Sequence, residues 1–168
     1  MKIIAQIIGL LAFFFSLFAY HKNQKKKILK NMILSNALKL IHYLLLGAHS
    51  GLLTKILSII RDVFIIEKEK HKTLDSNLFL ILFIIFYLII AVISYQDILT
   101  LFPIIAAMIY LVPIWNGSTK TLKKTALFTY VLWLVYDISI FSISGIIEHL
   151  ILIISTFLAL ITPYFKKN

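Results

Sequence analysis

Apolar runs long enough to cross a lipid bilayer follow one another along almost the whole chain. Their approximate bounds are 3–20, 29–46, 51–66, 77–94, 98–115, 125–141 and 146–163. A bilayer core is ~30 Å thick, and a helix needs roughly 20 apolar residues to cross it. Of the 168 residues, 61% are hydrophobic and 14% are charged, which is more apolar surface than a soluble domain of this size can bury. The chain is therefore predicted to be an all-α membrane protein with seven transmembrane helices, and the lipid bilayer is its expected partner.

The lysines between the apolar runs predict how the chain is oriented in the membrane. The connections at 47–50, 95–97 and 142–145 contain no lysine or arginine. The alternate connections and the C-terminal segment contain Lys22, Lys25, Lys26, Lys27, Lys30, Lys68, Lys70, Lys72, Lys120, Lys123, Lys124, Lys166 and Lys167. Because cytoplasmic loops are enriched in basic residues, we expect the N-terminus outside and the C-terminus in the cytoplasm. These segments account for the net charge of +10, so no nucleic-acid partner is expected.

An internal repeat becomes visible when the sequence is displaced by 94 positions. The first three apolar runs then fall on the last three without a gap. Ser50-Gly51 falls on Ser144-Gly145 at the turn before the third run of each set, and Gly9 falls on Pro103. We therefore predict two parallel three-helix-bundle repeats, at residues 1–66 and 98–168. A linker at 67–97 joins them and contains the fourth transmembrane helix.

Polar residues at helical spacing form stripes that match between the two sets of runs. The second and third runs carry Asn36, Lys39, His42, Tyr43, Thr54, Lys55, Ser58, Arg61 and Asp62. The sixth and seventh carry Tyr130, Trp133, Tyr136, Asp137, Glu148, His149, Ser155 and Thr156. The fourth run has Tyr87 as its strongly polar group and is expected to face lipid. Parallel repeats of this kind are a known transporter plan, with the binding site between the repeats.

Some of these residues are similar to those of a known family. The stretch Ile41-His42-Tyr43-Leu44-Leu45-Leu46-Gly47 is followed by Ile56-Leu57-Ser58 and Arg61, and later by Leu101-Phe102-Pro103-Ile104, Trp133, Asp137, Gly145 and Glu148. Together they resemble the YgjV-type family of bacterial inner-membrane proteins. The resemblance implies the bacterial inner membrane and a relationship to the superfamily of SWEET, PQ-loop and PnuC vitamin-transporter proteins. Most members with known roles move small polar solutes by alternating access, and others are sorting receptors. Lys39 and Lys55 depart from the family pattern, and no glutamine follows Pro103.

Ionisable residues inside the predicted spans indicate the candidate site, because charges within a membrane are costly and mark solute pathways. We predict that a substrate-binding cavity between the repeats is faced by Lys39, His42, Arg61, Trp133, Asp137 and Glu148. Cations of the second and third helices would meet carboxylates of the sixth and seventh, which lowers the cost of burying both. Arg61 and Asp62 can alternatively pair with each other. His42, Lys55, Asp137, Glu148 and His149 would line a chamber open to the outside, in which Trp133 stacks on a small zwitterionic or polyhydroxylated solute.

Other functions receive less support from the sequence. The chain has no cysteine, which excludes disulfides, zinc–thiolate sites and a cysteine nucleophile. Ser58 and Ser155 lie in no catalytic motif, so no enzyme is expected. Glu148 and His149 point about 100° apart on a helix, so no metal and no cofactor are expected. The expected function is transport of a small polar solute. A membrane receptor or structural module that does not transport is the alternative, and a homo-oligomer is compatible with either.

Overall fold

Helices account for all regular structure in the described part of the chain. The computed structural model describes residues 2–20, 24–71 and 74–165, which hold seven α-helices, the short 3₁₀ helix η2 and no β-strand. The elements are α1 (Lys2–Tyr20), α2 (Lys25–Leu46), α3 (His49–Lys68), α4 (Asn77–Ile93), η2 (Ile98–Leu101), α5 (Phe102–Asn116), α6 (Thr119–Ser139) and α7 (Ile143–Phe165). The predicted all-α class with seven helices is confirmed. Lys22, Lys72, Lys166 and Lys167, used above for orientation, lie outside the described residues.

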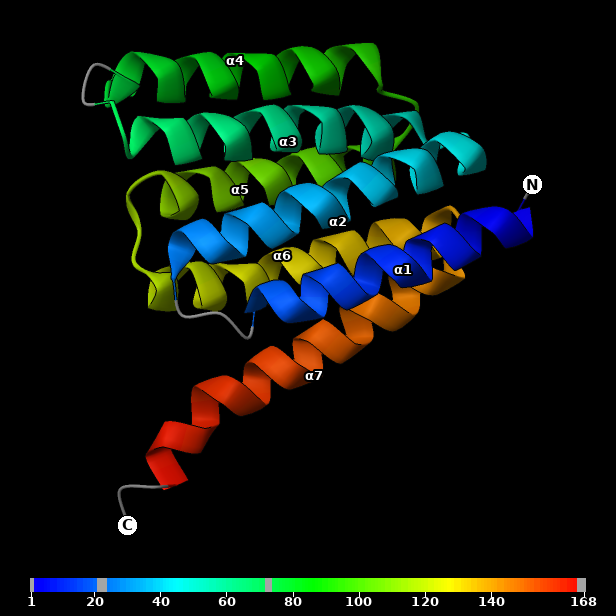
Figure 1. Ribbon diagram of the computed structural model, residues 1–168. Helices are drawn as coiled ribbons and strands as arrows, with labels where there is room; N and C mark the ends of the chain where they lie inside the picture. Colours follow the sequence, from blue (N-terminus) through cyan, green and yellow to red (C-terminus); the bar gives the residue numbers. More distant parts are fainter. Residues whose placement is uncertain (1, 21–23, 72–73, 166–168) are drawn as a thin grey trace.

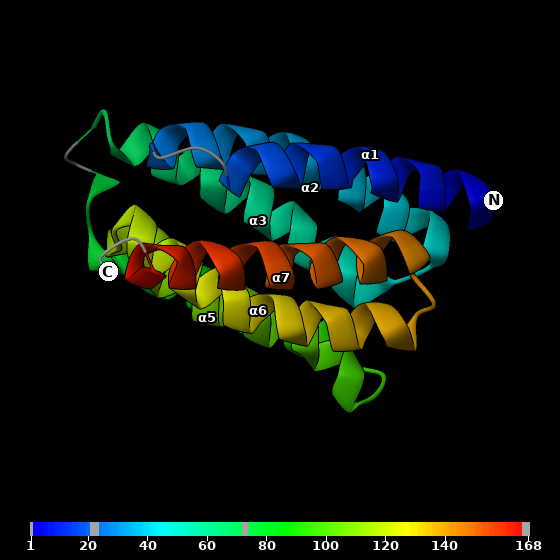
Figure 2. The same cartoon turned by 90° about the horizontal axis from the view of Figure 1, so that it is seen from below.

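The helices form two groups of three. In one group α2 packs against α1 and α3, and in the other α6 packs against α5 and α7. Contacts of α1 with α7 and of α3 with α5 join the groups, which lie on opposite sides in Figure 2. Helix α4 lies at the edge, against α3 and α5 (Figure 1), and buries only Phe83 and Tyr87. Six helices therefore surround the interior between the groups.

Both central helices begin earlier than the apolar pattern predicts. Helix α2 begins at Lys25 rather than near 29, and α6 begins at Thr119 rather than near 125. Lysine is a good helix former, so the basic residues extend each helix beyond its apolar part. Helix α6 is also capped by Ser118, whose hydroxyl oxygen accepts a hydrogen bond from the backbone N–H of Thr121 at 3.2 Å. Apolar length thus underestimates a helix that continues into a basic segment.

Two helical windows in the described residues are by themselves long and apolar enough to cross a membrane. They are Lys2–Ala19 in α1 and Ile98–Asn116 in η2 and α5. Helix α4 and the part Ile143–Leu158 of α7 are apolar but shorter. Helices α2, α3 and α6 contain charged residues, which lower their mean hydropathy. A span that keeps such charges inside the protein can still cross a bilayer, so seven spans remain a prediction.

The turn after the second helix of each group has the same hydrogen bonds at an offset of 94 positions. The backbone N–H to carbonyl bonds are Gly47 to Leu44 and Ala48 to Tyr43 after α2, and Phe141 to Ile138 and Ser142 to Asp137 after α6. Gly47 and Phe141 both adopt the left-handed conformation, with φ of +71° and +54°, which often closes a helix. Helices α3 and α7 then begin at His49 and Ile143, again 94 positions apart. These matches support the predicted repeat, whose arrangement as two parallel three-helix bundles remains a prediction.

Candidate functional site

A cavity of about 70 Å³ lies between the two groups of helices. Every α-helix except α4 contributes to its lining, and most of the lining side chains are polar or aromatic. Each ionisable residue of the lining is at most 8% exposed, so the cavity lies deep within the protein. The lining residues are Ser16, Met32, Ser35, Asn36, Lys39, Lys55, Ser58, Arg61, Ala106, Ala107, Tyr110, Thr129, Tyr130, Trp133, Glu148, His149 and Leu152.

The lining repeats itself at the offset of 94 positions that relates the two halves of the sequence. Twelve of the seventeen lining residues form six pairs with this spacing. The pairs are Ser16 with Tyr110, Ser35 with Thr129, Asn36 with Tyr130, Lys39 with Trp133, Lys55 with His149, and Ser58 with Leu152. The lysines and the arginine come from the first half, and the carboxylate and all the aromatic rings come from the second. The cavity therefore has two chemically different walls built from corresponding positions.

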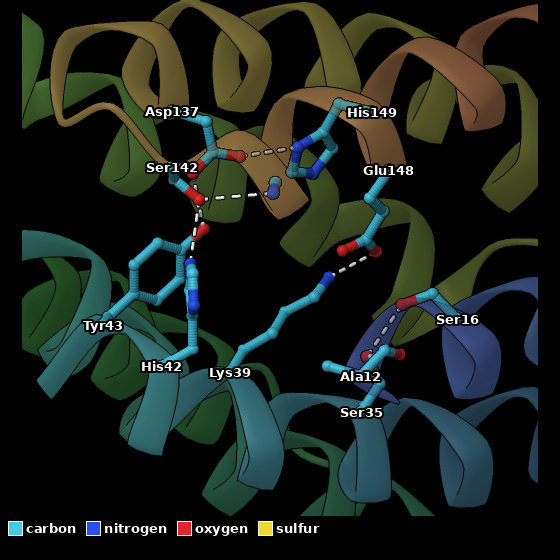
Figure 3. A network of polar contacts seen from close by, with 11 residues as sticks. Ala12, Ser16, Ser35, Lys39, His42, Tyr43, Asp137, Ser142, Glu148 and His149 are labelled. Carbon is cyan, nitrogen blue, oxygen red and sulfur yellow. Dashed lines mark hydrogen bonds and ion pairs between the residues drawn. The ribbon is translucent and has the colours of Figure 1, made fainter. Parts of the chain in front are cut away.

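One ion pair crosses the cavity between the two groups. Nζ of Lys39 on α2 donates to Oε1 of Glu148 on α7 at 2.6 Å, and their side chains are only 9% and 2% exposed (Figure 3). The hydroxyl of Ser35 donates to the carbonyl oxygen of Ala12 at 3.0 Å and lies 2.7 Å from the hydroxyl of Ser16. Since the Ser35 proton is used, Ser16 donates to Ser35. This part of the lining is neutral and internally hydrogen-bonded.

Arg61 pairs with Asp62 of its own helix, which is the local alternative given above, and not with a carboxylate of the sixth or seventh helix. Its Nε and Nη2 lie 2.9 and 2.7 Å from Oδ1 of Asp62, and the two residues are 2% and 0% exposed. The adjacent carboxylate neutralises the guanidinium without help from another helix. Nη1 of Arg61 donates to the hydroxyl of Tyr87 at 3.2 Å, which also lies 3.3 Å from the hydroxyl of Ser58. Helix α4, expected only to face lipid, thus contributes one polar group to the interior.

Asp137 and His42 do not line the cavity but belong to a layer of hydrogen bonds beside it (Figure 3). Oδ1 of Asp137 accepts from the hydroxyl of Tyr43 at 3.0 Å, and Oδ2 lies 2.8 Å from Nδ1 of His149. Nδ1 of His42 lies 2.7 Å from the carbonyl oxygen of Ala5. Because a carbonyl can only accept, Nδ1 of His42 carries a proton. Both oxygens of the Asp137 carboxylate therefore have partners within the protein.

The same layer connects each second helix to the first turn of the third helix in the other group. The hydroxyl of Tyr136 on α6 accepts from the backbone N–H of Gly51 on α3 at 3.0 Å. Nε2 of His42 on α2 lies 2.8 Å from the hydroxyl of Ser142, which accepts from the N–H of Gly145 on α7 at 3.2 Å. His42, Tyr136 and Ser142 are at most 2% exposed. Buried hydrogen bonds thus lie where a chamber open to the outside was predicted.

Trp133 has a cation over its ring. Nζ of Lys55 on α3 lies 3.6 Å from the ring centroid, which is the geometry of a cation–π contact. The rings of Tyr43 and His149 lie near-parallel to Trp133, with centroids 5.8 and 6.1 Å away and interplanar angles of 21° and 10°. Stacking of Trp133 on a solute would therefore require one of these contacts to rearrange.

Four of the six predicted site residues line the cavity, namely Lys39, Arg61, Trp133 and Glu148. The site prediction left out lining residues that carry no charge, among them Ser16, Ser35, Asn36, Tyr110 and Thr129. The 94-position displacement is the signal that could have found them, because it pairs polar residues of corresponding helices. In the described part of the chain, no three histidine, aspartate or glutamate side chains are grouped as ligands of a metal ion.

The chain belongs to the Imp-YgjV family, which is described as bacterial inner membrane protein and whose sequence model matches residues 3–167. The match covers both groups of helices and almost the full length of the chain. The resemblance to YgjV-type proteins and the inner-membrane location expected from it are therefore confirmed. No curated protein and no solved structure matches the chain.

Proposed function

We propose that the protein is a multi-pass transporter that moves a small polar solute across the bacterial inner membrane by alternating access. The observation that carries the proposal is the central cavity, which is lined by six pairs of residues at corresponding positions of the two halves. In transporters built from repeats, the solute binds at the interface of the repeats near the middle of the membrane. The relationship to SWEET, PQ-loop and PnuC proteins implied by the sequence resemblance supports the same role.

The position of the cavity along the helices agrees with a solute site near the middle of the membrane. Ser35 and Asn36 lie at the middle of α2, Ser58 lies at the middle of α3, and Thr129 lies at the middle of α6. With seven spans and the N-terminus outside, the ends of these helices reach the two membrane surfaces. All four residues would then lie about equally far from either surface.

Different layers separate the cavity from the two ends of the molecule. Toward the end proposed to face outside lie the buried contacts of His42 with Ser142 and of Tyr136 with Gly51. Toward the end proposed to face the cytoplasm lie apolar side chains that are at most 1% exposed, Leu29, Ile65, Ile114 and Leu122. A structure closed on both sides is an intermediate that alternating access requires. Transport would open one layer while the other stays closed.

The small size of the cavity favours the alternative, a receptor or structural module that does not transport. A cavity of about 150 Å³ admits benzene, whereas this one measures about 70 Å³. Any solute larger than a few water molecules therefore needs the helices to move apart.

The proposal includes no catalytic step, no cofactor and no nucleic-acid partner, and it allows a homo-oligomer.

The test is uptake by purified protein in liposomes, using labelled sugars, amino acids and vitamins with and without the same solute preloaded inside. Asn36→Leu removes a buried polar group of the lining without breaking any hydrogen bond found in the described structure. Because a hydrogen bond to the solute would be lost, uptake at low solute concentration should fall about tenfold. Asn77→Leu makes the same change at the exposed start of α4 and should leave uptake unchanged.

Saturable uptake that accelerates with preloaded solute supports a transporter. Binding of a solute without flux supports the receptor, and neither binding nor flux across the panel supports the structural module. Equal uptake by the Asn36→Leu and Asn77→Leu proteins would show that the solute passes elsewhere.

A further inference from the structure

Lys55 differs from the other cations of the cavity because it has no carboxylate partner among the described residues. Lys39 pairs with Glu148, and Arg61 pairs with Asp62. Lys55 lines the cavity and is 7% exposed, yet its ammonium makes neither a salt bridge nor a hydrogen bond with the described residues. Its contact is with the Trp133 ring, 3.6 Å from Nζ. A ring face attracts a cation but leaves the three N–H donors of an ammonium without an oxygen acceptor.

The nearby carboxylates are already engaged by other groups. Glu148 accepts from Lys39, and Oδ1 of Asp62 accepts from Arg61, whereas Oδ2 of Asp62 has no hydrogen-bond partner among the described residues. Both oxygens of Asp137 are taken, one by the hydroxyl of Tyr43 and the other by His149. Three carboxylates therefore stand against three cations around the cavity. None of these carboxylates lies within ion-pair distance of Lys55. No acceptor among the described residues lies within hydrogen-bond distance of this ammonium, so an oxygen of a bound ligand can supply one.

A second donor of the lining also lacks a partner. Asn36 is 5% exposed and lines the same cavity, and its amide makes no hydrogen bond with the described residues. An amide and an ammonium that face one small space can both donate to the oxygens of a single ligand. Charge-assisted hydrogen bonds to an oxyanion are about twice as strong as neutral ones. This favours an anionic oxygen over a neutral hydroxyl as the acceptor.

We propose that the ligand of this cavity carries a carboxylate or another small oxyanion, which binds the ammonium of Lys55 and the amide of Asn36. The proposal rests on the proposed function of the cavity as a solute site. A volume of about 70 Å³ admits a group of a few heavy atoms, such as a carboxylate. The rest of a larger solute would occupy space that opens when the helices separate. On binding, the ammonium leaves the Trp133 ring for the anion.

The contact of Lys55 with Trp133 makes binding visible by fluorescence. The chain has two tryptophans, so in a Trp115→Phe background the emission reports on Trp133 alone. The protein is placed in nanodiscs of uncharged lipid and titrated with sodium formate, sodium acetate or inorganic phosphate. Acetamide, a neutral molecule of the shape of acetate, is the ligand control. Thermal stabilisation of the protein with both tryptophans is a second readout, because a ligand stabilises the state that it binds.

We expect a saturable change of emission with at least one of the anions and none with acetamide. Lys55→Gln should raise the half-saturating anion concentration about tenfold or more, because a charged donor is lost. Lys70→Gln removes a lysine whose side chain is 50% exposed and should change nothing, which controls for the general loss of one positive charge. An equal response to acetate and acetamide, a Lys55→Gln protein that binds acetate normally, or no response to any anion would each overturn the proposal. The first and third of these outcomes do not depend on how the variant folds.

Failure of this proposal can be distinguished from failure of the transport function. Uptake of a neutral solute that Lys55→Gln leaves unchanged would overturn the anion site and leave transport standing. Anion binding that depends on Lys55, without flux in liposomes, would overturn transport and leave the anion site standing.

Discussion

The ion pair of Lys39 and Glu148 allows the coupling between the two groups of helices to be measured. The atoms lie 2.6 Å apart, and the side chains are 9% and 2% exposed, so neither charge has water as an alternative partner. Removing one partner of a buried pair destabilises a protein by about 3–5 kcal/mol. In Glu148→Gln the amide oxygen still accepts a hydrogen bond from Lys39, so we expect the lower end of this range, about 3 kcal/mol.

Thermal unfolding of the purified protein in one detergent, followed by circular dichroism, measures the effect. For a chain of this length, each kcal/mol shifts Tm by about 2–4 °C, so Glu148→Gln should lower Tm by about 6–12 °C. Lys39→Met should lower Tm by a similar amount, because it leaves the carboxylate unpaired. The double variant removes both charges and should unfold near the wild-type Tm, since loss of a whole buried pair is often neutral.

A matched control uses a pair on the protein surface. Glu67 accepts from Lys70 at 2.6 Å near the exposed end of α3, and this hydrogen bond lowers the pKa of the Glu67 carboxyl. Both side chains are more than 40% exposed, so Glu67→Gln should leave Tm almost unchanged. If the two single losses at the buried pair simply add in the double variant, the reasoning is refuted, because the two residues would then act independently.

Three further predictions concern the turns, the crossing of the helices and the topology. Phe141→Gly should raise stability by about 1 kcal/mol, because Phe141 has φ of +54°. Gly47→Ala should lower stability by a similar amount, and the opposite sign for either change in thermal unfolding would contradict this. Gly145→Ala should lower stability by about 1–3 kcal/mol, because an added Cβ would lie 2.5 Å from Cγ of Asp137. A neutral effect would show that the Asp137 carboxylate moves freely. A reporter fused after Asn168 should be active in the cytoplasm, and periplasmic activity would refute the orientation.

The number and positions of the helices could be predicted from the sequence because apolar length is a direct consequence of the membrane. For α4, the predicted range 77–94 and the observed Asn77–Ile93 differ by one residue. The early start of α2 at Lys25 could not be predicted in this way. Helix propensity, rather than hydropathy, decides where a helix begins in a basic segment. A lysine in such a segment is compatible with either a loop or a helix.

Partners of buried charges were predictable only where one choice was available. Lys39 has no acidic neighbour on its own helix, so a carboxylate from another helix was required. Arg61 has Asp62 beside it, so the sequence is equally compatible with a local pair and with a pair across the cavity. The role of Tyr87 could not be predicted, because it depends on how α4 lies against α3. The hydrogen bond from Ser142 to His42 depends on the conformation of a turn, which the apolar pattern does not describe.

The contact of Tyr43 with Asp137 bears on why the two halves have few identical residues. These residues are 94 positions apart, and the hydroxyl of Tyr43 donates to Oδ1 of Asp137 at 3.0 Å. A residue can touch its own counterpart only close to an axis that relates the two halves. Identical side chains there would place two carboxylates, or two phenols, against each other. One donor and one acceptor are complementary, so a difference in sequence at this pair is what allows the halves to meet.

The same argument applies to the charges around the cavity. Trp133 occupies the position that corresponds to Lys39, and the ammonium of Lys55 lies 3.6 Å from its ring. If a lysine stood at position 133, its ammonium would share this buried space with that of Lys55, at a separation on the order of 4 Å. Their repulsion would be about 4 kcal/mol at an effective dielectric constant of about 20, a large part of the stability of a protein of this size. An aromatic ring turns that repulsion into attraction. The predicted repeat is therefore compatible with a chemically asymmetric cavity. Lys39→Trp combined with Trp133→Lys should leave Lys55 facing a like charge, so the double variant should have a lower Tm than Lys39→Trp alone in thermal unfolding.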